Sequence, residues 1–554
     1  MQSVEYVTSQ KIWRAPEFKT GSFSLGAVIL EKLKHSDPEK ILEVHHESGT
    51  HVTVKETREK TITVSQNLLN LGVKKNDRVV FFTNLNLKIT PLTFACYTIG
   101  APVCFFETNL EQEHVPAYLK MLDPSVIIYE ERFKSMVTEG LKNLNLSNLR
   151  HVLTLDGDQN SVDELFFEPV VDIESFQAPD LGDPRSLPAI LGFTSATTGL
   201  PKIIMNSHAM VRHSAYNYFQ AKPNIVVMVL SAVRWCCQQT VMIQPALLGV
   251  KRIYSSTAPL HMTGEFMRTI IDTHQVTHYI DVPRLMRTLY EAVERYKKRD
   301  PSTLSTLKFA WIGGESDGGV LEAYISKITP HCMVVRCYGL TEVAGSFATS
   351  EFVSSKQNVN GGILKNGFMI KLMDNDGNPL GPNQIGRVCV KIAAPFLGYL
   401  KNDFANKESF IEGGWLNTGD MGIVYSDKLL NIFVREKYAL RYSDCSIFFP
   451  NSVEEIVNNF NGVYSSALVG NPSAENFNKY CGTIFVVLES GSLNSAVFEN
   501  RFRSYLRKEI TKEQLEVIKY FKVIDDLPKT TCYKVDRMAL KRIVQGGSKI
   551  YCQK

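Results

Sequence analysis

The fold class of this chain is decided by three short apolar runs, RVVFF (78–82), APVCFF (101–106) and SVIIY (125–129). A helix-like stretch follows each of the first two runs, through TFACY (93–97) and EQEHV (111–115). Near-continuous apolar runs that alternate with helices are typical of parallel strands whose two faces are both buried. The sequence therefore predicts an α/β fold with helices on both faces of a sheet.

The same pattern continues downstream. FAWI (309–312) leads to a Gly-Gly pair, and MVV (333–335) is soon followed by a Tyr-Gly pair. Two more strands are expected at GRVCVKI (386–392) and LNIFV (430–434). No repeat of 20–50 residues is visible in the sequence, which argues against solenoids and propellers.

A domain boundary is expected near residue 430, because the strongly charged segment REKYALR (435–441) begins there. The segment that follows has its own elements, a helix at 451–459 and strands at 466–470 and 482–488. These are enough for a small α+β domain. We therefore predict an N-terminal domain of residues 1–432 and a C-terminal domain of residues 433–554.

Composition excludes several classes of protein. Hydrophobic residues make up 44% and charged residues 21% of the chain, which is ordinary globular usage and argues against disorder. Lys and Arg exceed Asp and Glu by only 61 to 57, too little and too evenly spread for a nucleic-acid or membrane-binding surface. The eleven cysteines contain no CxxC pair, which favours reduced thiols over a disulfide framework.

The same residues lead to an expectation about location. The opening MQSVEYVTSQ (1–10) lacks the apolar core of a secretory signal. The longest apolar run (225–233) is about half of a membrane span. We expect a cytoplasmic protein without a membrane span. The peroxisome stays open as an alternative, although the chain lacks a terminal Ser-Lys-Leu and Ser-Lys-Ile (548–550) stops four residues short of the end.

Four polar segments are candidates for the chemistry. The first is TSATTGLPK (194–202), which follows an apolar run. Its hydroxyl groups and backbone N–H groups can hold phosphate oxygens, and Lys202 supplies a positive charge. It is not a Walker P-loop, because Pro201 separates Gly199 from the lysine. On composition alone, a polar surface turn is the alternative interpretation.

The other three segments are weaker when taken singly. YGLTE (338–342) combines a ring that can stack on a base, a hydroxyl for a phosphate and a carboxylate for a divalent cation. GWLNTGD (414–420) ends in an aspartate that suits the paired hydroxyls of a ribose, or caps a helix. LPKTTCYKVDR (527–537) is a basic segment near the terminus. Ordinary turns are the alternative for each.

Together and in this order, the four segments resemble the motifs of the adenylate-forming superfamily, [ST]SGTTGxPK, YGxTE, GW…TGD and PKTxxGKxxR. This superfamily includes acyl-CoA synthetases, 4-coumarate–CoA ligases, beetle luciferases and adenylation domains of peptide synthetases. The resemblance covers nearly the whole chain, and GRVCVK (386–391) with Gly398-Tyr399 is similar to the strand and turn before the third motif. It implies a large N-terminal domain of mixed sheets with helices, a small mobile α+β C-terminal domain, and an active site between them.

The resemblance implies an ATP-dependent, AMP-forming acid–thiol ligase, an acyl-CoA synthetase that acts on a fatty or aryl acid. The carboxylate attacks the α-phosphate of ATP to give an acyl-adenylate and pyrophosphate, and coenzyme A then displaces AMP. The implied cofactors and partners are ATP, Mg²⁺, coenzyme A and a small carboxylic acid, with no nucleic acid. A peptide-synthetase module is disfavoured because no carrier domain follows Lys554. The acid and the oligomeric state are left open.

Position within the motifs implies a role for each residue. The phosphate loop would hold the β- and γ-phosphates, the tyrosine of the second motif would stack on adenine, and the Gly-Gly-Glu segment would line the adenine pocket. The aspartate of the third motif and an arginine after it would hold the ribose. The residues implied to bind ATP or AMP are Thr194, Ser195, Thr197, Thr198, Gly199, Gly313, Gly314, Glu315, Tyr338, Gly339, Asp420 and Arg435.

The residues implied to act in catalysis are Lys202, Thr341, Glu342 and Lys534. Thr341 would touch the α-phosphate, Glu342 would bind Mg²⁺, and Lys534 would stabilise the charge that builds on the transferring phosphate. Further positions are implied for the hinge, the coenzyme A channel and the acyl pocket. These are Lys437 for the hinge, Arg441 and Tyr442 for the channel, and Trp235 for the acyl pocket.

Four positions depart from the family pattern. Ala196 and Tyr533 replace glycines of the first and last motifs, and each change removes backbone freedom. Val434 stands where an aspartate often precedes the ribose-binding arginine, and Asp444 places a carboxylate near the expected path of the anionic coenzyme. These departures motivate an alternative function, a catalytically weakened luciferase-like relative that binds nucleotide or an acyl ligand without efficient thioester formation.

Overall fold

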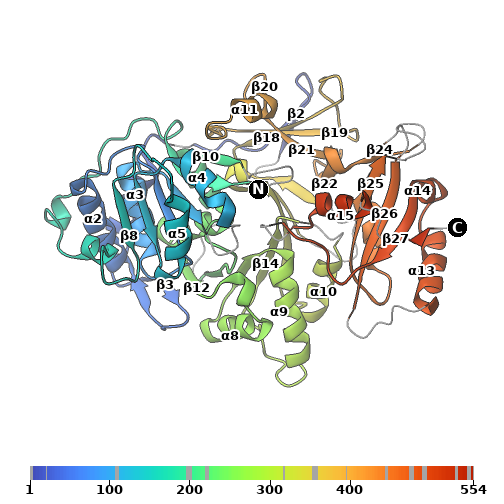
Figure 1. Cartoon of the computed structure of the whole chain (residues 1–554), viewed down its shortest axis with the longest axis horizontal. Coiled ribbons are helices and arrows are strands. Elements are labelled where there is room, and N and C mark those ends of the chain that lie inside the picture. Colours follow the sequence, from blue (N-terminus) through green and yellow to red (C-terminus); the bar gives the residue numbers. More distant parts are fainter. Residues whose placement is uncertain are drawn as a thin grey trace.

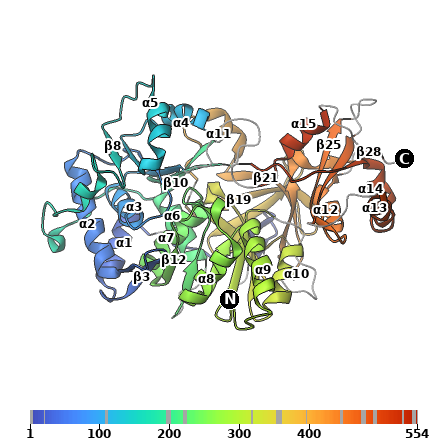
Figure 2. The same cartoon turned by 60° about the horizontal axis from the view of Figure 1, so that its bottom comes forward.

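The protein is described by a computed structural model, shown in Figure 1. The larger part of the chain forms two sheets with helices around them, and the C-terminal part lies at one end of the molecule with a sheet of its own (Figures 1 and 2). The structure describes residues 4–19, 21–106, 112–194, 202–218, 224–315, 319–351, 360–394, 396–442, 447–472, 480–489, 496–530, 534–545 and 551–552.

The runs that decided the fold class form neighbouring strands of a six-stranded sheet, ordered β10-β9-β6-β5-β7-β8. Four of its five pairings are parallel, and the β9–β10 pairing is antiparallel. The α/β prediction is therefore confirmed. The strands are β5 (Val79–Phe82), β6 (Val103–Phe106), β7 (Val126–Tyr129), β8 (His151–Thr154), β9 (Pro188–Phe193) and β10 (Ile203–Ser207).

Both faces of this sheet are buried, which explains why its strands are apolar at every position. Phe81 stacks on Phe105 on one face, with the ring centroids 4.8 Å apart, and Phe82 stacks on Phe106 on the other, at 4.6 Å. The first pair packs with α1, α2 and α3, and the second pair packs with α4 and α5. The bounds of these helices are Leu25–Lys34, Val54–Asn70, Ile89–Ile99, Val115–Leu122 and Lys134–Leu141, for α1 to α5 in order.

The helix expected through 111–115 begins later than the sequence predicts. A 3₁₀ turn covers Gln112–His114, and α4 starts at Val115. Pro116 is the second residue of α4, where its missing N–H costs no hydrogen bond because the first N–H groups of a helix have no partner within it.

The second sheet has sixteen strands among the described residues, in the order β1-β2-β18-β19-β21-β22-β17-β16-β15-β14-β13-β11-β12-β3-β4, with β20 paired to β21. It mixes parallel and antiparallel neighbours, as the family resemblance implied. Its strands are β1 (Glu5–Val7), β2 (Ile12–Arg14), β3 (Ile41–His45), β4 (His51–Thr53), β11 (Val226–Met228), β12 (Lys251–Tyr254), β13 (His278–Asp281), β14 (Phe309–Gly313), β15 (Met333–Leu340), β16 (Gly345–Glu351), β17 (Gly361–Leu364), β18 (Phe368–Met373), β19 (Ile385–Ile392), β20 (Phe410–Ile411), β21 (Trp415–Val424) and β22 (Leu430–Arg435).

Helices accompany this sheet through the middle of the chain (Figure 1). α9 and α10 pack on the β13–β14–β15 region. α6 and α7 pack against each other, α7 contacts β3, β12 and β16, and α6 contacts β9 and β10 of the first sheet. The helices are α6 (His208–Asn217), α7 (Cys236–Leu248), α8 (Gly264–His274), α9 (Pro283–Tyr296), α10 (Val320–Ile328) and α11 (Asp403–Ser409).

The C-terminal part has its own sheet, ordered β25-β26-β27-β28, and a separate hairpin of β23 and β24. Apolar residues on both faces of β25 and β26 form two clusters that pack on its helices. The strands are β23 (Leu440–Arg441), β24 (Ile447–Phe448), β25 (Val463–Pro472), β26 (Tyr480–Leu488), β27 (Ile518–Val523) and β28 (Tyr551–Cys552). The helices are α12 (Pro450–Asn458), α13 (Ala496–Glu509), α14 (Lys512–Val517) and α15 (Arg537–Gln545).

The domain boundary expected between residues 432 and 433 falls inside β22. That strand pairs with β21 up to Arg435, so residues 433–435 are part of the large sheet. A 3₁₀ turn (Glu436–Tyr438) follows directly. We therefore propose that the boundary lies after Arg435. Within the described ranges, no helix is long and apolar enough to cross a membrane.

A buried ion pair joins two strands at one edge of the large sheet. Arg252 of β12 and Glu43 of β3 are paired across the ladder, their charged atoms are 2.5 Å apart, and their side chains are 0% and 4% exposed. Thr90 also donates a hydrogen bond to Glu43 at 3.1 Å, and the guanidinium of Arg252 lies 4.8 Å from the ring centroid of Tyr254. Breaking such a pair leaves an uncompensated buried charge.

We predict that Arg252→Met lowers the free energy of unfolding by about 3–5 kcal/mol, because Glu43 then stays buried without its counter-ion. The double variant Glu43→Leu/Arg252→Met should recover most of this loss, since neither charge is left. Urea unfolding at neutral pH, followed by circular dichroism, measures both. A single variant within 1 kcal/mol of wild type, or a double variant less stable than the single one, would contradict the prediction.

Candidate functional site

The second and third motifs meet at the end of β15 and the middle of β21. β14 ends at Gly313, its neighbour β15 carries Tyr338 and Gly339, and a 3₁₀ turn (Thr341–Val343) follows at once. β21 carries Asp420 and stands opposite Arg435, the last residue of β22. Residues about 80 positions apart in the sequence therefore share one place in the fold.

Asp420 is the centre of the first contact group. It is 6% exposed, accepts a hydrogen bond from the Tyr338 hydroxyl on Oδ2 at 2.6 Å, and forms an ion pair with Nε of Arg435 on Oδ1 at 3.1 Å. Burial, and then the Asp420 carboxylate, raise the pKa of Tyr338 well above its ordinary value, so the phenol stays protonated and donates. The Tyr338 ring also packs edge-on against Phe347, with centroids 4.7 Å apart.

Two glycines keep the strand surface beside this group flat. A Cβ on Gly339 would lie 2.0 Å from the carbonyl oxygen of Gly345 on β16, a distance that no side chain can adopt. Gly314 has φ +96°, a left-handed conformation that favours glycine. The backbone therefore approaches closely here.

A second contact group surrounds Glu342. The Tyr399 hydroxyl donates to Oε1 of Glu342 at 2.9 Å, and the ammonium group of Lys202 lies 4.7 Å from the centroid of the Tyr399 ring. Thr194 and Lys202 are joined by two hydrogen bonds, Thr194 N–H to the Lys202 carbonyl at 3.0 Å and Lys202 N–H to Thr194 Oγ1 at 3.2 Å. The neighbouring carbonyl of Thr341 accepts from Asn206 at 2.9 Å.

Several predicted residues cannot be placed. Ser195, Thr197, Thr198 and Gly199 lie outside the described residues, and so do the departures Ala196, Tyr533 and Asp444. The fourth departure, Val434, pairs with Met421 in the β21–β22 ladder as an ordinary strand residue.

Positive charges gather beside these two groups. Burial first, and then the charges of Arg435, Lys202 and Lys541, lower the pKa of the Lys437 ammonium below its ordinary value. Lys437 therefore lies within electrostatic range of Lys202, just before β10, of Arg435 at the end of β22 and of Lys541 on α15. Like charges repel, so the arrangement favours a ligand with several negative charges.

The C-terminal part reaches the same place through the fourth motif. The Val535 N–H donates a hydrogen bond to Oε1 of Glu315 at 3.1 Å. Lys534, Glu315 and Gly314 line a cavity of about 20 Å³ together with Trp235, Val282, Pro283 and Arg284. α15, which follows Lys534, lies on the side of the C-terminal part that faces the rest of the molecule (Figures 1 and 2).

The thiol of the half-buried Cys236 lies near these groups. Burial, and then the carboxylate of Glu342, raise its pKa to about 12, while the positive charge of Lys534 acts in the opposite direction. Lys534 and Glu342 therefore both lie near the start of α7. Trp235 precedes that helix and also lines a second cavity of about 10 Å³ with Ser231, Ala232, Pro259, Val282, Arg284 and Leu285.

The remaining predicted residues lie in the segment after β22. Lys437 is in the 3₁₀ turn, with its ammonium 5.1 Å from the Tyr438 ring centroid. Arg441 ends β23, and Tyr442 packs on Phe448 with centroids 5.3 Å apart. The contacts of Glu342 with Tyr399 and of Glu315 with Val535 are not predicted by the sequence, although the sequence does predict a turn at Gly398-Tyr399.

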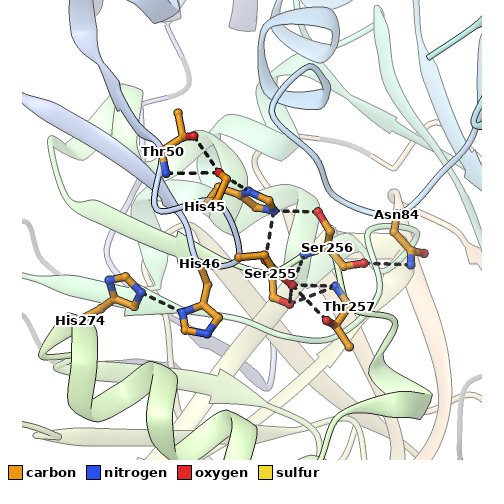
Figure 3. Close-up of polar contacts among 10 residues, drawn as sticks. His45, His46, Thr50, Asn84, Ser255, Ser256, Thr257 and His274 are labelled. Carbon is orange, nitrogen blue, oxygen red and sulfur yellow. Dashed lines mark hydrogen bonds and ion pairs between the residues drawn. The ribbon is translucent and has the colours of Figure 1, made fainter. Parts of the chain in front are cut away.

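A further polar network ties the edge of the large sheet together (Figure 3). Oε1 of Glu47 accepts from the Ser255 hydroxyl at 2.5 Å and from the backbone of Ser256 at 3.0 Å. The His45 ring bonds the Ser256 hydroxyl at 2.8 Å, and Asn84 donates to the Ser256 carbonyl at 3.3 Å. The network fastens the turn after β3 to the loop after β12 and to the end of β5. No group of three or more metal-ligating side chains is found in the described ranges.

Comparison with known proteins identifies a family whose model matches this chain. The model of the family described as "AMP-binding enzyme" matches residues 31–400. A putative acyl–CoA ligase, YdaB, of Bacillus subtilis is 24% identical over 507 residues, covering 89% of this chain and 94% of the relative. A long-chain-fatty-acid–CoA ligase of Escherichia coli is 24% identical over 519 residues, covering 86% of this chain and 87% of the relative.

The fold also matches a solved structure over nearly its whole length. The anthranilate CoA ligase AuaEII, crystallised with anthranoyl-AMP, superposes with a TM-score of 0.83 at 19% identity, over 95% of this chain and 99% of the other. At this identity the match shows a shared fold, including the C-terminal part.

The cluster of cations predicts binding of a polyphosphate. Inorganic tripolyphosphate should raise the thermal unfolding midpoint, and at 100 times its Kd the gain in free energy is about 2.7 kcal/mol. Added salt should weaken the effect through screening. Lys437→Met should lower the affinity about tenfold, whereas Lys407→Met, on an exposed position of α11, should leave it unchanged. Thermal shift and calorimetric titration measure this, and an unaltered affinity in Lys437→Met would contradict it.

Proposed function

The chain belongs to the AMP-binding enzyme family, and from this premise we propose that it activates a fatty or aryl carboxylic acid with ATP and transfers the acyl group to coenzyme A. The observation that supports this most directly is the position of Lys534, which lines a cavity with Glu315 and Trp235 and lies near Cys236, as Glu342 does. A further carboxylate, that of Asp420, bonds the Tyr338 hydroxyl and forms an ion pair with Arg435.

The chemistry requires such an arrangement. A carboxylate is a weak nucleophile, and the negative oxygens of a triphosphate repel it, so positive charges must be in place before attack. An oxygen of the acid forms a bond to the α-phosphorus, and pyrophosphate leaves with the electrons of the broken P–O bond. The thiol of coenzyme A then attacks the acyl carbon, loses its proton, and AMP leaves. Lys202, Lys437 and Lys534 are the cations proposed for the first step.

Residue roles in nucleotide binding follow as part of the proposal. Asp420 and Arg435 are proposed to hold the ribose, and the ring of Tyr338, oriented by its bond to Asp420, is proposed to stack on adenine. Gly313 and Gly314 are proposed to leave room for the base, and Gly339 keeps β15 close to β16. Thr194 and the loop after it are proposed to hold the terminal phosphates.

This site can bind Mg²⁺ only together with the substrate, whose phosphates would supply further ligands to the ion. Mg²⁺ is bound in such sites by one or two carboxylates together with substrate phosphates and water. Glu342 is the carboxylate proposed to bind it, and its Oε1 is oriented by Tyr399. When bound, the ion neutralises phosphate charge and favours departure of pyrophosphate.

The comparisons give no support to the alternative of a catalytically weakened relative. One of the four departures that motivated this alternative also loses its weight, because Val434 is an ordinary strand residue. We further propose that the C-terminal part moves about Lys437 between the two steps, so that Lys534 takes part only in the first one. Arg441 and Tyr442 remain proposed neighbours of the coenzyme A channel.

The first test is acid-dependent pyrophosphate release from Mg-ATP over a panel of fatty and aryl acids. We expect release with at least one acid, and formation of its CoA thioester when coenzyme A is added. Lys534→Met should slow the adenylation step about 100-fold, because it removes a charge that acts in the transition state. Lys529→Met is the matched control, since Lys529 is an exposed lysine of the same segment.

Two results would contradict this proposal. One is pyrophosphate release at background with every acid of the panel. The other is equal adenylation rates in Lys534→Met and Lys529→Met. Thioester formation from a supplied acyl-adenylate should change less than threefold in Lys534→Met, which separates a loss of the first step from a general loss of folding.

A second test concerns Glu315, which is proposed to hold the Lys534 segment through the Val535 N–H. Glu315→Ala should slow adenylation about fivefold and leave thioester formation from supplied acyl-adenylate unchanged. Glu315→Gln keeps an oxygen acceptor and should retain most of the rate. Single-turnover measurements of the two half-reactions decide this. Equal losses in the alanine and glutamine variants, or equal losses in both half-reactions, would show that the hydrogen bond does not position Lys534.

A further inference from the structure

A lysine lies among aromatic rings behind the candidate site. Lys365 follows β17, and its ammonium group bonds the Ser346 hydroxyl of β16 at 2.5 Å. The same group lies 4.8 Å from the ring centroid of Tyr218 and 5.7 Å from that of Trp311 on β14. Cation–π contacts of this kind stabilise an ammonium group only in part.

The surroundings of this charge are apolar. Tyr218 and Trp311 belong to a buried cluster with Val241 and Ile280, against which Cys237 and Cys337 pack. Burial lowers the pKa of Lys365 to about 8, which leaves the group mostly protonated at neutral pH. Within the described residues the structure records no ion pair for Lys365. Lys365 is half-buried, and a charge partly removed from water without a counter-ion is costly, so such a charge is usually paired.

A second hydrogen-bond donor lies in the same cluster. The indole N–H of Trp311 is buried and has no hydrogen-bond partner among the described residues, and the Trp311 side chain is next to the ammonium of Lys365. A buried donor without an acceptor also costs free energy. The Trp311 N–H therefore lacks an acceptor, and the Lys365 ammonium, although bonded to the Ser346 hydroxyl, lacks a negatively charged partner among the described residues.

The position of this pair relative to the reaction centre follows from the strands that carry it. Trp311 comes two residues before Gly313 on β14, so the Trp311 side chain lies on the face of the strand to which a side chain at position 313 would also point. Gly313 is paired with Cys337, the residue before Tyr338. On α7, Cys237 follows Cys236, the thiol near Glu342 and Lys534. The ammonium of Lys365 thus lies within electrostatic range of Cys337 and Cys237, which are next in sequence to Tyr338 and Cys236.

We propose that Lys365 is a specificity-determining residue, and that the acid carries a second anionic group which pairs with its ammonium and with the Trp311 N–H. This inference rests on the proposed function and narrows it, from fatty or aryl acids in general to those with a second negative group. In this proposal the reacting carboxylate of the acid lies near Glu342 and Lys534, and its second anionic group lies at the other end of the acid, beside Lys365 and Trp311. A plain hydrocarbon tail would end against the half-buried charge of Lys365, which disfavours such an acid.

The test compares acids that differ only in the second carboxylate. The pairs are adipate with hexanoate and terephthalate with benzoate, and the assay is pyrophosphate release. For wild type we expect kcat/KM at least tenfold higher for the diacid in one pair. Lys365→Met keeps the length of the side chain without its charge. It should lower kcat/KM for that diacid at least tenfold and raise it for the monoacid, so that the preference is reversed.

A matched control and a wild-type measurement keep the test independent of folding defects. Lys371→Met removes another lysine that lies over a tryptophan, 4.8 Å from the ring centroid of Trp415 on β21, and should leave the preference unchanged. In wild type, the ratio of diacid to monoacid activity should fall as the pH rises through about 8, because Lys365 loses its proton there. The ratio cancels pH effects common to both acids.

Each outcome bears on the inference separately from the proposed function. If monoacids are the better substrates of wild type, or if Lys365→Met or rising pH leaves the ratio unchanged, the inference is overturned while the ligase activity stands. If none of these four acids supports pyrophosphate release while a monoacid of the wider panel does, the inference alone is overturned; if no acid of the panel does, the proposed function and this inference fail together.

Discussion

The arrangement of the whole site depends on holding like charges together. Lys202 and Lys541 are far from Lys437 in the sequence, yet together with burial, the larger cause, and with Arg435 they lower the pKa of the Lys437 ammonium. In the absence of an anion this clustering is destabilising. The apolar packing on both faces of the two sheets offsets it, because burial of a large core supplies the stability that the site loses. A multiply charged ligand therefore completes the structure electrostatically.

The strands and the nucleotide motifs could be predicted because their signals are local. The apolar runs at 78–82 and 101–106 form β5 and β6, since both faces of that sheet are covered and every position must be apolar. Tyr338 and Asp420 were expected in one site from their motifs, and the structure joins them at 2.6 Å. The bonds of Glu315 to Val535 and of Tyr399 to Glu342 could not be predicted, because contacts between distant segments leave no pattern in either segment.

The proposed domain boundary illustrates two different signals, charge in the sequence and hydrogen bonding in the sheet. The charged segment from 435 to 441 marks where the chain becomes polar, whereas a sheet ends where its ladder of hydrogen bonds ends. Arg435 satisfies both conditions, because it is a charged residue that also pairs with Asp420 in the ladder. Lys365 shows the converse case, since a single lysine after a strand reads as a surface residue until the packing places its ammonium between two rings.

The pairing of Arg435, the last residue of β22, has a consequence for movement of the C-terminal part. Arg435 is held to Asp420 by the sheet and by an ion pair, and the 3₁₀ turn that contains Lys437 starts at the next residue. If the C-terminal part rotates there, the axis of rotation passes beside the proposed sugar contacts. The nucleotide would then remain docked at the pivot while the surface above it is exchanged, and one bound AMP moiety could serve two successive active sites without leaving the protein.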